Sequence, residues 1–143
     1  MKLAVLRVRG RRKIRAELED TLRMLRLERP NNCVIVDDSP QNMGMIEKVK
    51  DYVAYGPVDE QAIFKLLMKR GRKGRDILNK VMKEDEIKKA ASEIFGGKKT
   101  KDFANPVFRL RPPSKGYKNI RKAYPEGDLG KRDDITALLS RMM

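Results

Sequence analysis

The hydrophobic pattern opens with a strand and a helix. In residues 3–9 (LAVLRVR) every second side chain shares a face, and the segment passes from apolar to basic toward its end. Residues 16–28 carry leucines at helical spacing and acidic side chains in the first turn, where the helix dipole favours them. Pro30 and the two asparagines after it end this helix. The pattern therefore predicts a strand over 3–9 and a helix over 16–28.

A second strand, a second helix and a third strand follow. Residues 33–36 (CVIV) form a continuous apolar run, which is typical of a strand buried on both faces. Ser39 and Pro40 read as an N-cap and a first-turn proline, opening a helix that continues to Val49. Residues 52–55 form a short strand closed by a Gly-Pro pair. This β-α-β-α-β order favours a small sheet with both helices on one face.

The second half of the chain is less regular. Asp59 can cap a helix that ends at Gly71, and a second helix is predicted near 84–95, with its apolar positions on one side. Three further segments are an extended run over 107–110, a loop without period over 114–131, and a closing helix that begins near Asp133 or Asp134 and buries Ile135, Leu138, Leu139 and Met142.

Positive charge is concentrated in four stretches. The 143 residues include 34 Lys and Arg against 20 Asp and Glu, a formal net charge of +14. Twenty of the 34 basic residues lie in stretches that contain no acid, at 7–15, 69–75, 98–101 and 109–122. The other 109 residues carry 14 basic and 20 acidic side chains, a net charge of −6. The body is mildly acidic, and the stretches need a polyanion to neutralise them.

Nucleic acid is the first candidate for that polyanion, and an anionic membrane surface is the second. The longest apolar runs, such as Leu3–Leu6, are too short to cross a membrane, and the N-terminus lacks the apolar stretch of a signal peptide. The single cysteine, Cys33, cannot form an internal disulfide and lies in an apolar run. These observations favour a cytosolic, reducing environment with Cys33 in the core.

Most enzymatic sites are excluded by residue type. The chain has no His and one Cys, so it cannot assemble a Cys/His zinc site or a Ser-His or Cys-His catalytic pair. It also lacks the glycine-rich GxxxxGK[ST] loop of nucleotide-hydrolysing proteins. Neither a metal nor another cofactor is predicted.

Asp37 and Asp38 are the sharpest enzymatic candidate, because paired carboxylates after a strand can hold Mg²⁺. The string VDDSP resembles the acidic pocket of phosphoacceptor receiver domains. There, however, the pair follows the first strand and the third strand carries the phosphoacceptor Asp, whereas here the pair follows the second strand and the third ends in Gly56. We favour the simpler interpretation that Asp38 or Ser39 caps the next helix, and keep a Mg²⁺-dependent phosphoacceptor-like domain as the alternative.

The basic stretches suit phosphate contact in different ways. Five of the six cations in 7–15 are Arg, whose planar guanidinium can bind a phosphate with two hydrogen bonds. In 69–75, two glycines allow close approach to a phosphate backbone. In 109–122, Tyr117 could stack on a base or pack on the body. Residues 98–101 are as well explained by a solvated surface. Without an RRM or KH signature, we expect recognition of shape and phosphate.

Four strings carry a family resemblance: LAVLRVRGRRKIRAELEDTLRMLRL at 3–27, NNCVIVDDSPQNMGMIEKVKDYVAYG at 31–56, LLMKRGR at 66–72 and NPVFRLRPPSKGYKNIRKAY at 105–124. Together they resemble the archaeal branch of the large-subunit ribosomal protein family L-thirty, which is related to the eukaryotic family L-seven. PVFRLRPP and the basic loop after it are typical of the longer archaeal and eukaryotic form.

The resemblance implies an α+β fold, with a ferredoxin-like β-α-β-α-β core over 1–57 and a helical and loop extension over 58–143 packed on it. It implies a structural role in translation within the cytoplasmic large (50S) subunit, without catalysis, with large-subunit rRNA and neighbouring ribosomal proteins as partners. A free nucleoid or general RNA-binding module is a third interpretation. No role is assigned to Lys98, Lys99 and Lys101. The rRNA-binding residues implied are Arg7, Arg9, Arg11, Arg12, Lys13, Arg15, Lys69, Arg70, Arg72, Lys73, Arg75, Arg109, Arg111, Lys115, Tyr117, Lys118, Arg121 and Lys122.

Overall fold

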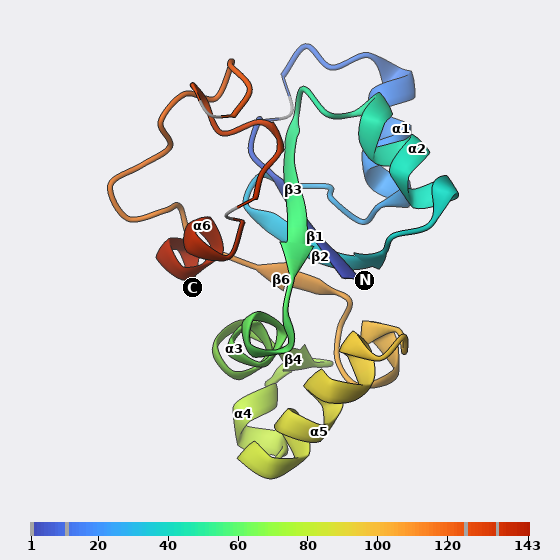
Figure 1. Cartoon of the computed structure of the whole chain (residues 1–143), viewed down its shortest axis with the longest axis vertical. Coiled ribbons are helices and arrows are strands. Elements are labelled where there is room, and N and C mark those ends of the chain that lie inside the picture. The colour runs from blue at the N-terminus through green and yellow to red at the C-terminus, as the bar shows by residue number, and fades with distance from the viewer. Residues whose placement is uncertain (1, 11, 125, 134) are drawn as a thin grey trace.

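The computed structural model describes residues 2–10, 12–124, 126–133 and 135–143. Along the chain (Figure 1) the elements are β1 (Lys2–Arg7), α1 (Ala16–Met24), β2 (Asn32–Asp37), α2 (Pro40–Lys48), β3 (Val53–Val58), α3 (Glu60–Arg70), β4 (Arg72–Lys73), β5 (Asp76–Ile77), α4 (Leu78–Val81), α5 (Glu84–Phe95), the 3-10 turn η1 (Thr100–Asp102), β6 (Val107–Arg109), β7 (Gly130–Lys131) and α6 (Ile135–Met142). The β-α-β-α-β order of the first half and the α+β class are both confirmed.

A five-stranded sheet organises the molecule in the order β6-β2-β1-β3-β7. The central strand β1 pairs antiparallel with β2 and with β3, and all six of its residues are buried. β6 extends the sheet antiparallel beside β2, while β7 joins β3 in parallel. Both outer strands come from the second half of the chain, so this half completes the sheet that the first half begins.

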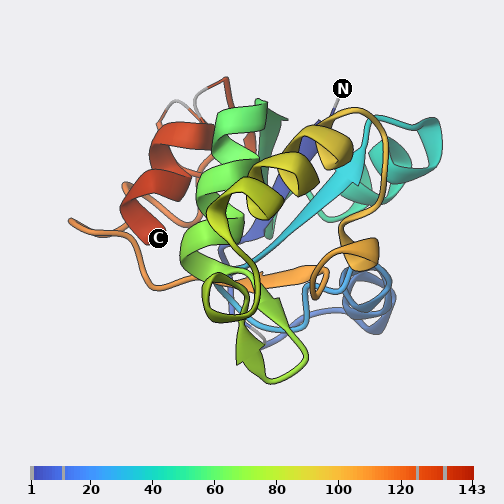
Figure 2. The same cartoon turned by 90° about the horizontal axis from the view of Figure 1, so that it is seen from below.

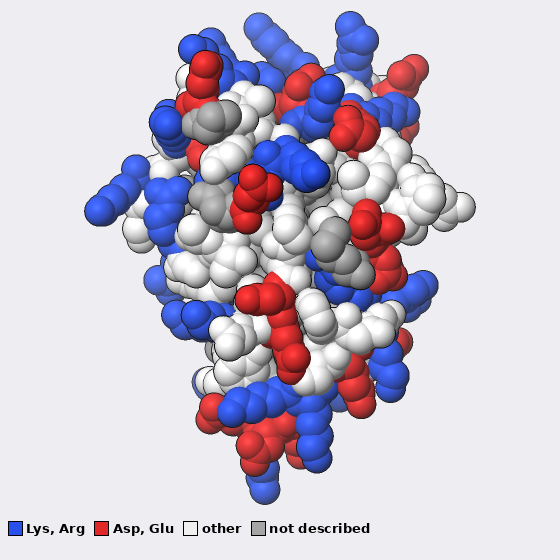
Figure 3. Space-filling view, in the orientation of Figure 1, with Lys and Arg blue, Asp and Glu red and all other residues white. Residues whose placement is uncertain are grey.

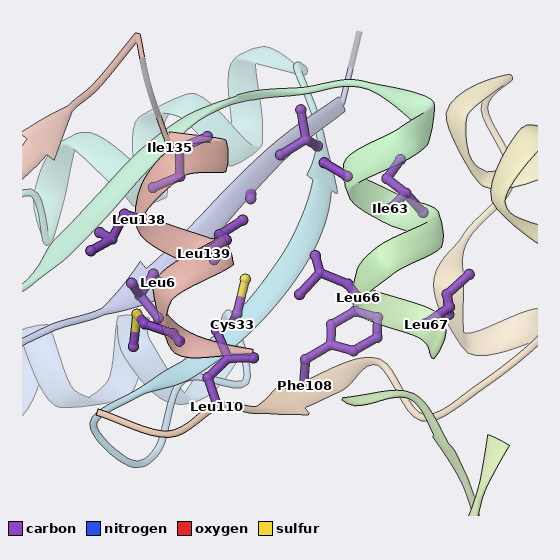
Figure 4. Packing of buried hydrophobic residues seen from close by; sticks show 14 of the residues in the cluster. Leu6, Cys33, Ile63, Leu66, Leu67, Phe108, Leu110, Ile135, Leu138 and Leu139 are labelled. Carbon is purple, nitrogen blue, oxygen red and sulfur yellow. The ribbon is translucent and has the colours of Figure 1, made fainter. Parts of the chain in front are cut away.

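Each face of the sheet has its own hydrophobic core. On one face, side chains such as Val5 and Val53 pack with Leu22 of α1 and Ile46 of α2. On the other face, the alternate side chains of β1 and β2 pack against α3, α5 and α6. Figure 4 shows Leu6 and Cys33 among leucines of α3 and α6 and Phe108 of β6. Figure 1 shows α1 and α2 together on one side of the sheet, as the sequence predicts.

Two predicted helix starts are confirmed by their caps. The Ser39 hydroxyl accepts a hydrogen bond from Asn42 N at 3.2 Å, and Pro40 occupies the first turn of α2. The Asp59 carboxylate accepts one from Ala62 N at 2.8 Å, and α3 ends at Gly71 as predicted. The predictions of α5 and of a closing helix are also confirmed, although Phe95, one of the apolar positions of α5, is 42% exposed.

Helix α1 ends at Met24, whereas the sequence predicted residue 28. Arg26 adopts a left-handed backbone conformation with φ of 64°, and its N–H donates to Arg23 O. Leu27 N donates back to Leu22 O at 2.8 Å, which completes a Schellman-type termination. Such terminations usually carry Gly in the left-handed position. An arginine there has no comparable sequence signal, so the sequence points to Pro30 as the end of the helix.

Strand β3 continues through the Gly-Pro pair that was predicted to close it. Gly56 and Pro57 pair with Ala4 and Leu3 of β1. A Cβ at Gly56 would lie 2.3 Å from the backbone oxygen of Arg132, so a glycine is needed where the chain beyond β7 crosses β3. The predicted stop is therefore a close approach of two backbones.

Candidate nucleic-acid interface

The first basic stretch divides into one buried and several exposed cations. Arg7 is 1% exposed, and its Nη1 donates to Leu27 O at 2.7 Å and to Glu28 O at 3.0 Å. Its guanidinium thus satisfies backbone carbonyls in the turn after α1, which is a structural role. This placement makes Arg7 inaccessible to a partner on the surface.

The exposed cations of this stretch lie at the turn before α1. Arg12, Lys13 and Arg15 are exposed, whereas Arg9 is half-buried with its guanidinium 5.0 Å from the centre of the Tyr52 ring. Arg11, also predicted to bind rRNA, lies outside the described residues.

A second group of cations projects from the loop over residues 114–132, called here the 114–132 loop. Lys115, Lys118, Arg121 and Lys122 are exposed there. Buried Asp128 holds the loop together: its carboxylate accepts from Lys118 N and Asn119 N and pairs with Arg132 Nη1 at 2.8 Å. Arg132 is 6% exposed and also covers the Tyr124 ring. A segment without sequence period therefore has an internal polar framework.

Tyr117 belongs to this framework. Its hydroxyl donates to Asn31 Oδ1 at 2.6 Å, and its ring packs at the edge of the core under α6. Burial is the main cause that raises the pKa of Tyr117 to about 12; the charge of nearby Asp128 contributes to the rise, and that of Arg141 opposes it. Of the two roles considered from the sequence, packing on the body is the one that the structure displays.

The third group forms a hollow that the sequence does not reveal as one site. Arg70 at the end of α3, Arg72 of β4, Arg75 of the β4–β5 turn and Arg109 of β6 line a depression of about 430 Å³, called here the arginine hollow. Figure 2 shows the β4–β5 hairpin (yellow-green) beside β6 (orange). The basic stretches 69–75 and 109–122, over thirty residues apart, therefore meet here.

Asn105 fixes the hairpin to the segment before β6. Asn105 N donates to Arg72 O at 2.7 Å, Asn105 Nδ2 donates to Gly74 O at 3.0 Å, and Asn105 Oδ1 accepts from Gly74 N at 3.3 Å. Gly74 has a φ of 66°, the left-handed conformation that favours glycine. The hairpin arginines are therefore presented from a backbone held at three points.

Arg70 is the most constrained cation of the hollow. Burial lowers the pKa of its guanidinium from the ordinary value, and the positive charges of Arg111 and Arg72 lower it further. Its Nε is buried, and no acceptor for it exists among the described residues. The lining of the hollow, residues Arg70, Arg72, Gly74, Arg75, Asn105, Pro106, Val107 and Arg109, includes no acid.

Two more hollows adjoin this one along the edge of the sheet. The next, of about 350 Å³, shares Pro106, Val107 and Arg109 with it and adds Arg26 and Arg29. The third, of about 270 Å³, shares Arg26 and Pro106 with the second. It adds Lys99 and Lys101, which had no predicted role. We call these three hollows together the edge groove.

Sequence reasoning missed Arg26 and Arg29. Both are exposed in the turn between α1 and β2, but Glu28 lies between them, and only acid-free stretches were counted as candidates. No sequence signal marks Arg26, because its left-handed position carries no glycine. Arg26 and Arg29 lie beside the other cations of the edge groove only because β6 pairs with β2 in the sheet.

The acidic pair after β2 is arranged for structure. Asp37 forms an ion pair with Lys2, whose side chain is 4% exposed and whose Nζ also donates to Lys98 O at 3.2 Å. Asp37 O accepts from Asn42 Nδ2 at 3.0 Å, while Asp38 is exposed. Within the described ranges, no three His, Cys, Asp or Glu side chains gather in a way that could hold a metal. The helix cap favoured from the sequence is confirmed at Ser39.

Charge is unevenly placed on the face in Figure 3. Lys and Arg lie mainly around its outline, and acidic side chains gather in the lower centre, where Figure 1 shows the turn from β3 into α3.

In the part of the chain that the structure describes, none of the helices is both long and apolar enough to span a membrane.

Known proteins resemble this chain over its whole length. A sequence model of the family described as Ribosomal protein L30p/L7e matches residues 3–53. A relative from Methanococcus maripaludis, named Large ribosomal subunit protein uL30, is 42% identical over 154 aligned residues that cover all of both chains. A relative of the same name from Archaeoglobus fulgidus is 40% identical over 149 residues, covering 97% of this chain and 98% of its own. The chain therefore belongs to the ribosomal protein L30p/L7e family.

Proposed function

We propose that the chain is a structural protein of the large ribosomal subunit in the cytoplasm and binds large-subunit rRNA through its basic surface. The relatives reported above are named as large-subunit proteins, and none carries the name of an enzyme. The arginine hollow carries the RNA-binding part of the proposal, because it collects four guanidinium groups from separate elements without an acid among them. Neighbouring ribosomal proteins are further proposed partners.

The proposed interface consists of exposed basic residues. Three groups contribute: Arg12, Lys13 and Arg15 before α1, the edge groove, and the cations of the 114–132 loop. Arg9, Arg11, Lys69, Lys73 and Arg111 remain candidates from the sequence. Arg7 and Tyr117 support this surface from within, through their contacts to the turn after α1 and to Asn31.

We also propose that residues 1–57 form the core unit and residues 58–143 an extension packed on it. The pairing of β6 with β2 and of β7 with β3 supports this packing. The packing matters for function, because the edge groove takes cations from both parts.

The proposed mechanism is electrostatic positioning. Lys and Arg side chains displace counterions condensed on the RNA, so affinity falls steeply with salt. Hydrogen bonds from guanidinium groups to phosphates fix the register of the protein on the folded RNA. The groups in this surface lie on both halves of the chain, so the protein can hold separate RNA segments at fixed distances.

Sedimentation tests the assembly. Tagged protein expressed in its own cell type should sediment with large subunits and stay bound through a high-salt wash. A protein that washes off while still binding free RNA would support the general RNA-binding module instead. The Mg²⁺-dependent alternative predicts a Mg²⁺-dependent change in stability that is lost in Asp37→Asn; we expect no such change, since Asp37 is paired with Lys2.

A further inference from the structure

We propose that the arginine hollow is a preformed binding site, called here the phosphate seat, for a single phosphodiester group of the RNA backbone. The rest of the basic surface attracts RNA only diffusely. This inference rests on the proposed function, because it takes the phosphate to be part of the bound RNA. It adds to that function a discrete ligand, a defined set of residues that bind it, and the geometry of the hollow in which they lie.

Charge is the first observation that points to a ligand. The side chains of Arg70, Arg72, Arg75 and Arg109 lie around one depression, which no carboxylate lines among the described residues. Arg70 is half-buried and lies within the repulsive field of Arg72. An anion bound in the hollow would offset this repulsion.

The second observation is the unpartnered donor. Arg70 Nε is buried and has no acceptor among the described residues, although most buried polar atoms in folded proteins have one. A guanidinium presents its N–H groups in a planar fork that fits two oxygens of a phosphate. Because Arg70 lines the hollow, a phosphate there would offer oxygen acceptors to its guanidinium group.

The third observation is that the backbone around the hollow is held in place. Asn105 makes three hydrogen bonds to Arg72 and Gly74. At the end of α3, a Cβ on Gly71 would lie 2.4 Å from Leu67 O, so the chain turns into β4 by a close approach that needs glycine. Less conformational entropy is then lost on binding, as for any preorganised site.

The 114–132 loop offers the contrasting case within the same molecule. Its buried cation, Arg132, already has Asp128 as a partner at 2.8 Å. Its exposed cations, such as Arg121, project from a loop with an internal framework and surround no unpartnered donor among the described residues. Arg121 is therefore a matched control for the arginines of the hollow.

Inorganic phosphate is the probe for the seat. Thermal unfolding of the full chain is measured at pH 7 in sodium phosphate and in sodium chloride of equal ionic strength. Binding to the folded state alone raises Tm, by about 4 °C at a phosphate concentration ten times Kd. We expect this phosphate-specific rise in the wild type and in Arg121→Gln, and its loss in Arg70→Gln and Arg109→Gln. Equal Tm values in the two salts for the wild type would overturn the proposal, as would a full rise in Arg70→Gln.

A charge-preserving variant separates a built seat from simple net charge. Arg109→Lys keeps the positive charge but loses the planar fork. It should bind phosphate at least fivefold more weakly by isothermal titration, while circular dichroism confirms its fold. Unchanged phosphate affinity in this variant would contradict a geometric seat.

RNA binding distinguishes the sources of the phosphate. Arg70→Gln should bind a large-subunit rRNA fragment about tenfold more weakly than wild type. If phosphate binds in the hollow but Arg70→Gln leaves the RNA affinity unchanged, the seat takes free phosphate and the inference for RNA is wrong. Wild-type protein that assembles into large subunits without a phosphate-specific Tm rise would refute the seat and leave the proposed function intact.

Discussion

The 114–132 loop and the arginine hollow are both basic, but they balance their charge in opposite ways. In the loop, Asp128 accepts from two backbone N–H groups and pairs with Arg132, so the framework is complete within the chain. In the hollow, Arg70, Arg72 and Arg109 face one depression without an acid. The buried cation of the loop has its counter-charge within the chain, whereas the arginines of the hollow need an anion from outside.

This difference separates stability from function. Cations that are paired within the protein hold a surface in shape, and their loss should unfold it locally. Cations that are unpaired and crowded destabilise the free protein slightly, and their loss should weaken binding while leaving the fold intact. The net charge of +14 contains both kinds, so total charge alone does not distinguish them.

The largest expected effect comes from breaking the framework of the loop. Asp128→Ala removes the carboxylate that pairs with buried Arg132 and accepts from two backbone N–H groups, so the free energy of unfolding should fall by about 3–5 kcal/mol. Urea unfolding measures this loss. Glu126→Ala, which removes an exposed partner of Lys122 at 4.0 Å, is the control and should change stability by less than about 1 kcal/mol. Similar losses in the two variants would show that Asp128 is not the centre of the loop.

The next effect tests the hollow against the loop in RNA binding. Arg72→Gln combined with Arg75→Gln should weaken binding to an rRNA fragment about thirtyfold, and should lower the slope of log affinity against log salt by about 2. The pair Arg121→Gln and Lys122→Gln removes the same charge from the loop and should weaken binding several-fold less. Stability should be unchanged in both, because all four side chains are exposed. Equal losses of affinity would mean that charge alone decides binding.

A smaller effect concerns the shape of the hairpin that carries the hollow. Gly74→Ala places a Cβ on a residue with φ of 66°, although nothing lies within 4 Å of that Cβ. The backbone strain should cost about 1–2 kcal/mol in unfolding free energy. Gly10→Ala is the control, since its Cβ is equally unobstructed and its φ is not left-handed. If both variants are equally stable, the hairpin does not depend on the left-handed turn.

The smallest effect is the hydrogen bond from Tyr117 to Asn31. Tyr117→Phe should cost about 0.5–1.5 kcal/mol at pH 7. The folded protein raises the pKa of Tyr117 from 10 to about 12, so the associated stability is present below pH 10 and is lost as the pH rises to 12. The loss of stability at high pH that is due to Tyr117 should disappear in the variant, while the losses due to Tyr55 and Cys33 remain. An unchanged pH profile would contradict the assignment.

Local signals predicted most of the elements. The caps at Ser39 and Asp59, the alternation in β1 and the apolar positions of α5 and α6 each depend on residues close in sequence, and the structure has these elements. The errors occur where the signal has two meanings. The Gly56-Pro57 pair is a turn signal, but here Gly56 allows a close approach of two backbones. Pro30 is a helix-stop signal, but the helix ends before it, with Arg26 in the left-handed conformation.

The candidate site was less predictable than the fold. The acid-free stretches included Arg7, which is 1% exposed and donates to carbonyls that lie twenty residues away. They omitted Arg26 and Arg29, which join the groove because β6 pairs with β2. They also left Lys99 and Lys101 without a role, although both line the same groove. A charge count records the type of a side chain but not its neighbours.

The sequence by itself determined that this chain is a basic α+β protein without a Cys/His zinc site or a Ser-His or Cys-His catalytic pair, because residue type and short-range periodicity are enough for those conclusions. Only the tertiary structure decided which cations are buried, which are paired by Asp128, and which meet in the arginine hollow. The physical reason is that electrostatic energy depends on distances between side chains. Those distances are set by strand pairing and loop crossings between residues far apart in the chain.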